Sequence, residues 1–171
     1  MTKSIHLSLD AMGGDNAPEI IVKGAAQSKI RHPNVKFSFF GNKNKLLPLI
    51  SSIKILKNSD IIHTNEFIDA NEKPSIAVRK GKNSSMSMAI QSVKSGHADA
   101  IISAGNTGAL MAMTKLFLRP IEGISRPAIA AYFPTITGES CMLDLGANIE
   151  CDAKNLVQFA FMGQAFANIV M

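Results

Sequence analysis

Three times along the chain, a strand-like segment runs directly into a glycine-marked turn, and a helical pattern follows the turn. Residues 4–10 alternate apolar and polar side chains up to Asp10, and Gly13-Gly14 then ends the alternation before Pro18 opens a helix. The second instance is the apolar run 98–104 followed by Gly105, and the third is the turn at Gly146. Strands that alternate with helices predict an α/β domain with a largely parallel sheet.

The remaining segments continue this alternation. Hydrophobic spacing predicts further strands and helices, the strands at residues 35–40, 60–64, 128–133 and 140–145 and the helices at 43–52, 85–95, 109–117 and 152–170. Ile20, Ile21 and Ala25 are expected on the buried face of the helix that follows Pro18. Residues 65–74 are polar and are expected to form a loop.

Composition excludes several classes of protein. The chain has 171 residues, enough for one domain with a hydrophobic core. Its formal charge is +5, but it has no Trp and a single Tyr, so the aromatic side chains that stack on nucleic-acid bases are missing. No apolar run approaches the roughly 20 residues that span a bilayer, and the start does not resemble a signal peptide. A cytoplasmic protein without nucleic-acid partners is expected.

Neither a metal nor an organic cofactor is indicated. Cys141 and Cys151 are ten residues apart, lack a paired histidine, and are interpreted as free thiols. No glycine turn completes a nucleotide-binding fingerprint, so no nucleotide is specifically indicated.

The last predicted helix is apolar most of the way round. Phe159, Phe166 and Val170 lie on one face, while Val157 and Phe161 lie on another. Such a helix is normally buried on more than one side, and the chain ends without a capping residue or a following strand. We therefore expect a truncated protein whose final helix packs against a missing partner. The alternative is a terminal helix that docks on its own domain.

The glycine turns suggest a site for an anion. Ligands of open parallel sheets bind at the carboxyl ends of the strands, where backbone N–H groups and helix N-termini attract negative charge. The candidate phosphate-binding residues are Gly13, Gly14, Lys80, Ser84, Ser85, Gly105, Asn106, Thr107 and Gly108. Most of them have a simpler interpretation: the glycines as ordinary turns, Asn106 and Thr107 as helix caps, and Lys80 as surface charge.

Six groups of residues occur in the order in which they occur in bacterial phosphate acyltransferases. The chain resembles that family through Leu9-Asp-Ala-Met-Gly-Gly-Asp-Asn-Ala-Pro18, Lys73-Pro-Ser75 with Ala77-Val-Arg-Lys80 and Ser84-Ser-Met86, Ser103-Ala-Gly-Asn-Thr-Gly-Ala-Leu110, Arg126-Pro-Ala-Ile-Ala130, Leu143-Asp-Leu-Gly-Ala-Asn148, and Asp152-Ala-Lys-Asn-Leu-Val-Gln-Phe-Ala160 with Met162-Gly163. The resemblance covers the chain from Ile5 onward. The family continues for about as much sequence again, so residues 1–171 correspond to the N-terminal portion of one acyltransferase domain.

The resemblance implies a fold and a set of partners. The fold is a three-layer α/β/α sandwich like that of isocitrate and isopropylmalate dehydrogenases, which phosphotransacetylases also use. The resemblance implies a homodimer that contacts the membrane peripherally. It also implies acyl carrier protein and inorganic phosphate as substrates. A glycerol-3-phosphate acyltransferase at the membrane is a further implied partner.

The implied reaction transfers a fatty acyl group from acyl carrier protein to phosphate and gives an acyl phosphate for phospholipid synthesis. Phosphate is already partly dianionic near pH 7 and the thiolate leaves readily, so the site needs donors for anions more than a strong base. Lys82, Asn106, Asp144 and Asn148 are the candidate catalytic residues. Lys82 is alternatively surface charge or a contact for the carrier protein, while Asp144 and Asn148 alternatively hold their turn.

Two other classes of function remain open. One is a fold-mate, either a phosphotransacetylase that acts on coenzyme A or a dehydrogenase, although the sequence lacks a ribose-binding pattern. The other is a non-catalytic half that binds phosphate or a partner chain without turnover.

Overall fold

The computed structural model describes residues 4–170. The chain divides into two compact units, Met1–Leu118 and Arg119–Met171, which are described separately below as the first and the second unit.

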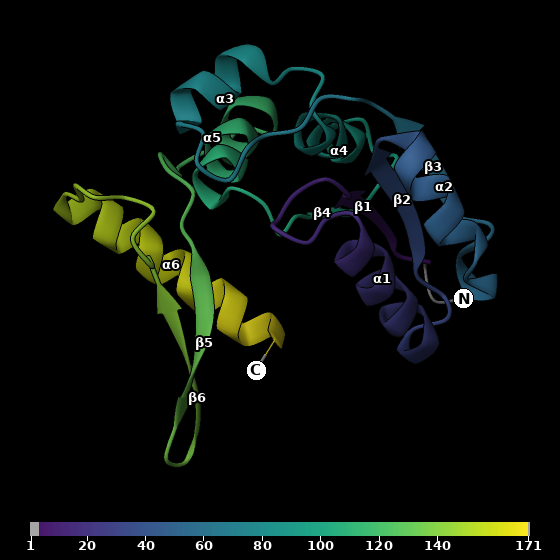
Figure 1. The fold of residues 1–171 in the computed structure, drawn as a ribbon. Helices are drawn as coiled ribbons and strands as arrows, with labels where there is room; N and C mark the ends of the chain where they lie inside the picture. Colours follow the sequence, from purple (N-terminus) through teal and green to yellow (C-terminus); the bar gives the residue numbers. More distant parts are fainter. Residues whose placement is uncertain (1–3, 171) are drawn as a thin grey trace. The chain divides into compact units, whose positions relative to one another are not determined.

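The first unit is built on a four-stranded parallel sheet (Figure 1). Its strands are β1 (His6–Asp10), β2 (Lys36–Gly41), β3 (Asp60–His63) and β4 (Ala100–Ile102). They lie in the order β3-β2-β1-β4, so that β1 is a central strand between β2 and β4. Three of these strands lie within segments that the sequence predicts as strands, and β2 extends one residue beyond its predicted segment, to Gly41. The predicted parallel sheet is confirmed for this unit.

Helices cover both faces of the sheet and give three layers (Figure 1). One face packs on α1 (Glu19–Arg31), α2 (Lys43–Ser51) and the short 3-10 helix η1 (Lys54–Leu56), and the opposite face packs on α4 (Ser85–Lys94). Two more helices, α3 (Pro74–Lys80) and α5 (Thr107–Phe117), pack on each other, and α5 also packs on α4. The expected three-layer α/β/α class is confirmed.

Alternation along the central strands sorts side chains between the two layers of helices. Leu9 of β1 and Phe39 of β2 are buried in the core cluster that also contains residues of α1 and α2. Ser8, Asp10 and Ser38, which alternate with them, lie on the α4 side and are also buried. One face of β1 is therefore apolar, while the other carries polar side chains into the interior.

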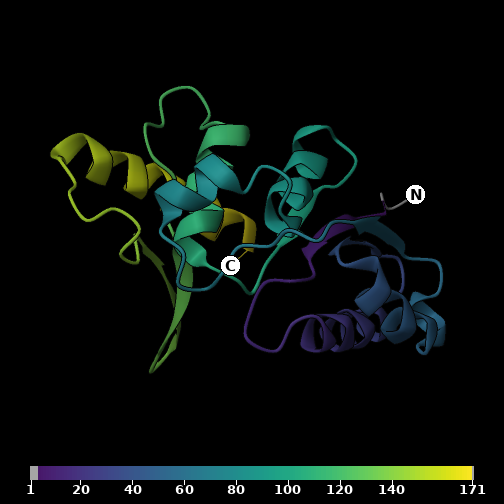
Figure 2. The same ribbon diagram turned by 45° about the horizontal axis from the view of Figure 1, so that its top comes forward.

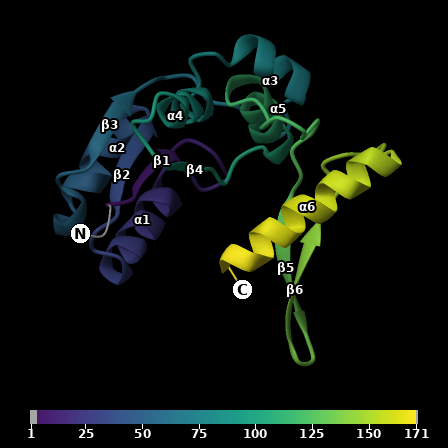
Figure 3. The same ribbon diagram turned by 180° about the vertical axis from the view of Figure 1, so that it is seen from behind.

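The second unit contains two strands and one helix. The strands β5 (Ala130–Thr135) and β6 (Gly138–Leu143) form an antiparallel hairpin. Helix α6 (Ala153–Val170) lies across one face of the hairpin (Figures 2 and 3), where the ring of Phe166 stacks on Tyr132 at 5.4 Å between centroids. Helix α6 confirms the predicted terminal helix.

Three details differ from the sequence predictions. Strands β5 and β6 pair with each other in antiparallel fashion, because two residues between them leave no room for the crossover that a parallel pair needs. Helix α3 follows the polar loop where no helix was expected. In α1 the buried residues are Val22 and Ala25, whereas Ile20 is exposed. No helix within residues 4–170 is both long and apolar enough to cross a membrane.

Candidate anion-binding site

The carboxyl end of β1 carries a buried carboxylate. Asp10 is 2% exposed, and its two oxygens accept hydrogen bonds from the hydroxyls of Ser85 and Ser103. Ser85 is the first residue of α4, and Ser103 follows directly after β4. Asp10 therefore joins three segments that are far apart in the sequence.

Two glycines bring the turns after β1 and β4 into contact. A Cβ atom on Gly13 would collide with the Asp10 carboxylate and approach the backbone nitrogen of Gly105 to 3.0 Å. The Gly105 N–H donates to the Ser103 hydroxyl at 3.1 Å, which fixes the second turn. Gly14 has a φ of 101°, a conformation that favours glycine. We call Asp10, Gly13, Ser85, Ser103 and Gly105 the Asp10 cluster.

Two helices begin beside the Asp10 cluster. Ser84 caps α4 by accepting from the Ser87 N–H, and Asn106 caps α5 by accepting from the Ala109 N–H at 2.9 Å. Helix N-termini carry partial positive charge, and neither first turn contains an acidic residue. The arrangement suits an anion chemically.

Asn106 is also a clamp for the preceding loop. Its side-chain amide donates to the backbone carbonyls of Asp69, Ala70 and Glu72 at 2.8–3.2 Å. Its carbonyl oxygen is the cap of α5, so the capping interpretation is visible in the structure. A role of Asn106 in phosphate binding or catalysis stays a prediction. Thr107 and Gly108 follow it on the exposed first turn of α5.

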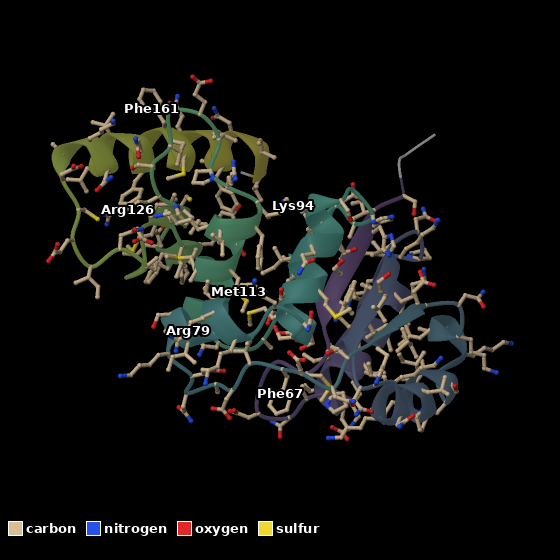
Figure 4. All side chains as sticks on the ribbon, turned by 90° about the horizontal axis from the view of Figure 1, so that it is seen from above. Phe67, Arg79, Lys94, Met113, Arg126 and Phe161 are labelled. Atoms are coloured by element: carbon tan, nitrogen blue, oxygen red, sulfur yellow. The ribbon has the colours of Figure 1, made fainter. Side chains whose placement is uncertain are left out.

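The two candidate lysines lie in different hollows. Lys80 and Ser84 line a cavity of about 260 Å³ together with Glu66 and Glu72. Lys82 lines a second hollow with Lys94 at the end of α4, and Lys94 is labelled in Figure 4. Of the two candidate lysines, only Lys80 therefore shares a cavity with Ser84, which the sequence predicted to bind phosphate.

Asp144 and Asn148 hold a turn of the second unit. The Asp144 carboxylate accepts from the backbone N–H of Ile129 at 2.8 Å and from that of Asn148 at 2.7 Å. The Asn148 side chain donates to the same carboxylate and to the carbonyl of Pro127. Burial by itself raises the pKa of Asp144, but these donated hydrogen bonds outweigh it and lower the pKa below 3.8. A catalytic role for either residue stays a prediction.

The Asp144→Asn variant tests this description of the turn. A carboxamide keeps one acceptor oxygen and loses the other, so either Ile129 or Asn148 loses its acceptor. We expect a loss of about 1 kcal/mol in local stability, small because the carboxylate is only partly buried. Amide hydrogen exchange of Ile129 and Asn148 measures it, with the exposed Glu150→Gln as the control.

The effect of Asp144 has a definite pH dependence. Because the folded-state pKa is lowered, the stabilisation is present above the ordinary value of 3.8 and is lost as the pH falls through the folded pKa. In acid, the amide exchange rates of the wild-type turn should therefore approach those of the Asp144→Asn variant. Equal exchange rates of the two proteins at pH 7 would contradict the prediction.

Part of the Asp10 cluster was not predicted from the sequence. Ser103 was not a candidate, although its hydroxyl donates to Asp10. The hydroxyl of Ser85 also donates to Asp10, and phosphate binding by Ser85 stays a prediction. A usable signal existed, because Ser103 lies near the end of a predicted strand and shortly before a glycine, as Asp10 does. Among residues 4–170, no group of His, Cys, Asp and Glu side chains is arranged to hold a metal ion.

The fold and the Asp10 cluster together define a class of protein. It is an α/β protein whose glycine turns meet at the carboxyl ends of parallel strands, where ligands of such sheets bind. Comparison with known proteins specifies the family. A family model described as "Fatty acid synthesis protein" matches residues 5–171, and the chain belongs to this family.

The curated relatives carry a common name. Proteins called phosphate acyltransferase are 51% identical in Rhodospirillum centenum, 49% in Parvibaculum lavamentivorans and 49% in Rhodospirillum rubrum. The alignments cover 99–100% of this chain but only 48–49% of each relative. The chain thus spans about half the length of the curated relatives it matches, and it corresponds to their N-terminal half.

Proposed function

We propose that this chain belongs to an enzyme that transfers a fatty acyl group from acyl carrier protein to inorganic phosphate. The observation that carries the proposal is the identity of about half of all residues, along the whole chain, with proteins named phosphate acyltransferase. The Asp10 cluster and the adjacent helix N-termini support it, since they offer an edge suited to an anion.

The proposed reaction is a direct substitution at the thioester carbonyl. An oxygen of phosphate attacks the carbonyl carbon, a C–O bond forms, and the C–S bond breaks to release the thiolate of the carrier. The thiolate takes up a proton, and the product is an acyl phosphate. No electron transfer is involved, so the protein must supply positioning and stabilisation of negative charge.

The positions of residues in the first unit support a proposal for their roles. The turns at Gly13, Gly14 and Gly105, together with the N-terminus of α5 at Thr107 and Gly108, would hold phosphate. Lys80, which shares a cavity with Ser84, would add positive charge from the end of α3. Asp10 would position the turns without touching substrate.

The acyl phosphate would serve phospholipid synthesis, with a glycerol-3-phosphate acyltransferase at the membrane as the enzyme that consumes it. A homodimer, a cytoplasmic location and peripheral contact with the membrane complete this proposal.

A second candidate is a non-catalytic half that binds phosphate or a partner chain. The coverage of 48–49% of the relatives favours it, because a whole active site can require both halves.

The discriminating assay measures release of free carrier thiol from acyl carrier protein, with and without phosphate. It is run on the 171-residue chain, and on the same chain mixed with the complementary half of the Rhodospirillum centenum relative. Phosphate-dependent release in the mixture supports the acyltransferase, and release by the chain alone refutes the non-catalytic half. Absence of release in both, despite a complex of the two chains, refutes the acyltransferase proposal.

Lys82→Glu tests the docking of the carrier protein. Carrier proteins are acidic, and Lys82 shares an exposed hollow with Lys94, so charge reversal should slow association about tenfold at low salt. The effect should shrink at high salt because screening removes it. Stopped-flow association in the active mixture measures the rate, and Lys57→Glu, on the opposite layer of the sheet, is the control. Equal rates for both variants would remove Lys82 from the docking surface.

A further inference from the structure

One side of the sheet in the first unit is only half covered. On the face opposite α1 and α2, α4 packs on β1, β2 and β4, and it leaves much of β2 and β3 without a helix. The gap is a hollow of about 850 Å³ between α4 and these two strands. Phe40, Ile62 and Met88 give it apolar walls, and Ser92 of α4 and Ser95, directly after α4, also line it. We call it the β2–β3 groove.

The spacing of strands and helices indicates how large an element the β2–β3 groove can hold. Neighbouring strands lie about 4.8 Å apart, and packed helices lie about 8–10 Å apart, so one helix covers about two strands. A four-stranded sheet thus takes two long helices on each face. The first face has α1 and α2, whereas the second has only α4. The groove is wide enough for one more helix.

None of the residues of the Asp10 cluster lines the β2–β3 groove. His6 and Asp60 are the first residues of β1 and β3, and His97 precedes β4, so these three lining residues mark the amino ends of the strands. The Asp10 cluster lies at the carboxyl ends. Phe40 and Ile62 lie one residue before the carboxyl ends of β2 and β3, so the groove extends along these strands, as a site for a helix lying on the sheet would.

We propose that the β2–β3 groove seats one helix from a polypeptide equivalent to the half of the curated relatives that this chain does not cover. The relatives are about twice as long as the chain, and they match it along its whole length. Their remaining half therefore supplies enough sequence for a fourth helix on this sheet. The apolar walls of the groove favour an amphipathic helix whose apolar stripe faces Phe40 and Ile62.

The test uses the 171-residue chain and the complementary half of the Rhodospirillum centenum relative, expressed together and purified by a tag on the second chain. Ser92→Trp places a large side chain at the rim of the groove and should weaken capture at least tenfold. Lys94→Trp lies on the same helix but outside the groove, and should leave capture unchanged. Circular dichroism of both variants checks that the first unit folds.

Thiol labelling of otherwise unaltered proteins gives a second measurement that does not depend on a bulky substitution. Ser95→Cys on the groove rim should react with a maleimide in the chain alone and be protected at least tenfold in the complex. Ser52→Cys, at the end of α2 on the opposite layer, should react equally in both. Labelling is read by peptide mass, which separates these sites from Cys141 and Cys151.

Three outcomes would overturn the proposal: no capture of the second half, capture with undiminished labelling of Ser95→Cys, or protection of Ser95→Cys in the chain alone through a homodimer. The assay of thiol release is independent of all three. A complex that protects the groove but releases no thiol would contradict the proposed function, and it would still support the binding of a helix in the β2–β3 groove.

Discussion

Replacing Asp10 by alanine is expected to lower the free energy of unfolding of the first unit by about 2–4 kcal/mol. The substitution removes the common acceptor of the Ser85 and Ser103 hydroxyls, and a buried hydroxyl without a partner costs about 1–3 kcal/mol. It also leaves a void in a site where Ser85 is fully buried. Urea denaturation followed by circular dichroism measures the loss.

Two further variants make this result specific. Asp10→Asn keeps the shape and one acceptor, so its stability should lie between those of wild type and Asp10→Ala. Asp15→Ala changes an exposed carboxylate in the same turn and should shift the midpoint little. If Asp10→Ala unfolds at the same urea concentration as Asp15→Ala, Asp10 does not join the three segments in solution.

The second large effect concerns α6. Five apolar side chains on this helix are 55–84% exposed, namely Leu156, Val157, Phe161, Ile169 and Val170. Phe161 is labelled on α6 in Figure 4. Each large side chain left in water forgoes about 1.5–3 kcal/mol of burial, and contiguous apolar patches are association sites. We expect the 171-residue chain alone to self-associate and to be poorly soluble.

Light scattering at increasing concentration measures this association. The double variant Val157→Ser with Phe161→Ser should stay monodisperse at concentrations where the wild type forms large species. Lys154→Ser, also on α6, should behave like the wild type. A monodisperse wild-type chain would contradict the prediction.

The local parts of the fold were predictable from the sequence. Alternation located β1 and β2, and the glycine turns after β1 and β4 were identified because glycine interrupts a clear pattern. Asn106 was recognised as a possible cap, since its position before a helical run is a local signal. Helix α3 was missed because seven residues carry too few apolar positions to show a period, although Pro74 marks its start.

The long-range parts of the candidate site were not predictable. Ser85 and Ser103 meet Asp10 across separations of 75 and 93 residues, and no spacing in the sequence encodes such a pairing. The clamp from Asn106 to the loop at Asp69 spans 37 residues and is equally invisible. For β5 and β6 the strand pattern was correct, but their direction depends on the length of the turn between them.

The place of β1 in the sheet also bears on how the first unit folds. Strand β2 follows β1 after one helix, whereas β4 reaches β1 only when the chain closes a loop of about 90 residues, as in the bond from His6 to Asp99. Closing long loops costs more chain entropy and slows folding, so β1, β2 and β3 should assemble before β4 docks. The two glycine turns can meet only after β4 arrives. Any affinity for phosphate that needs both turns would then appear in the last folding phase, and refolding in the presence of phosphate would reveal that order through the timing of its binding.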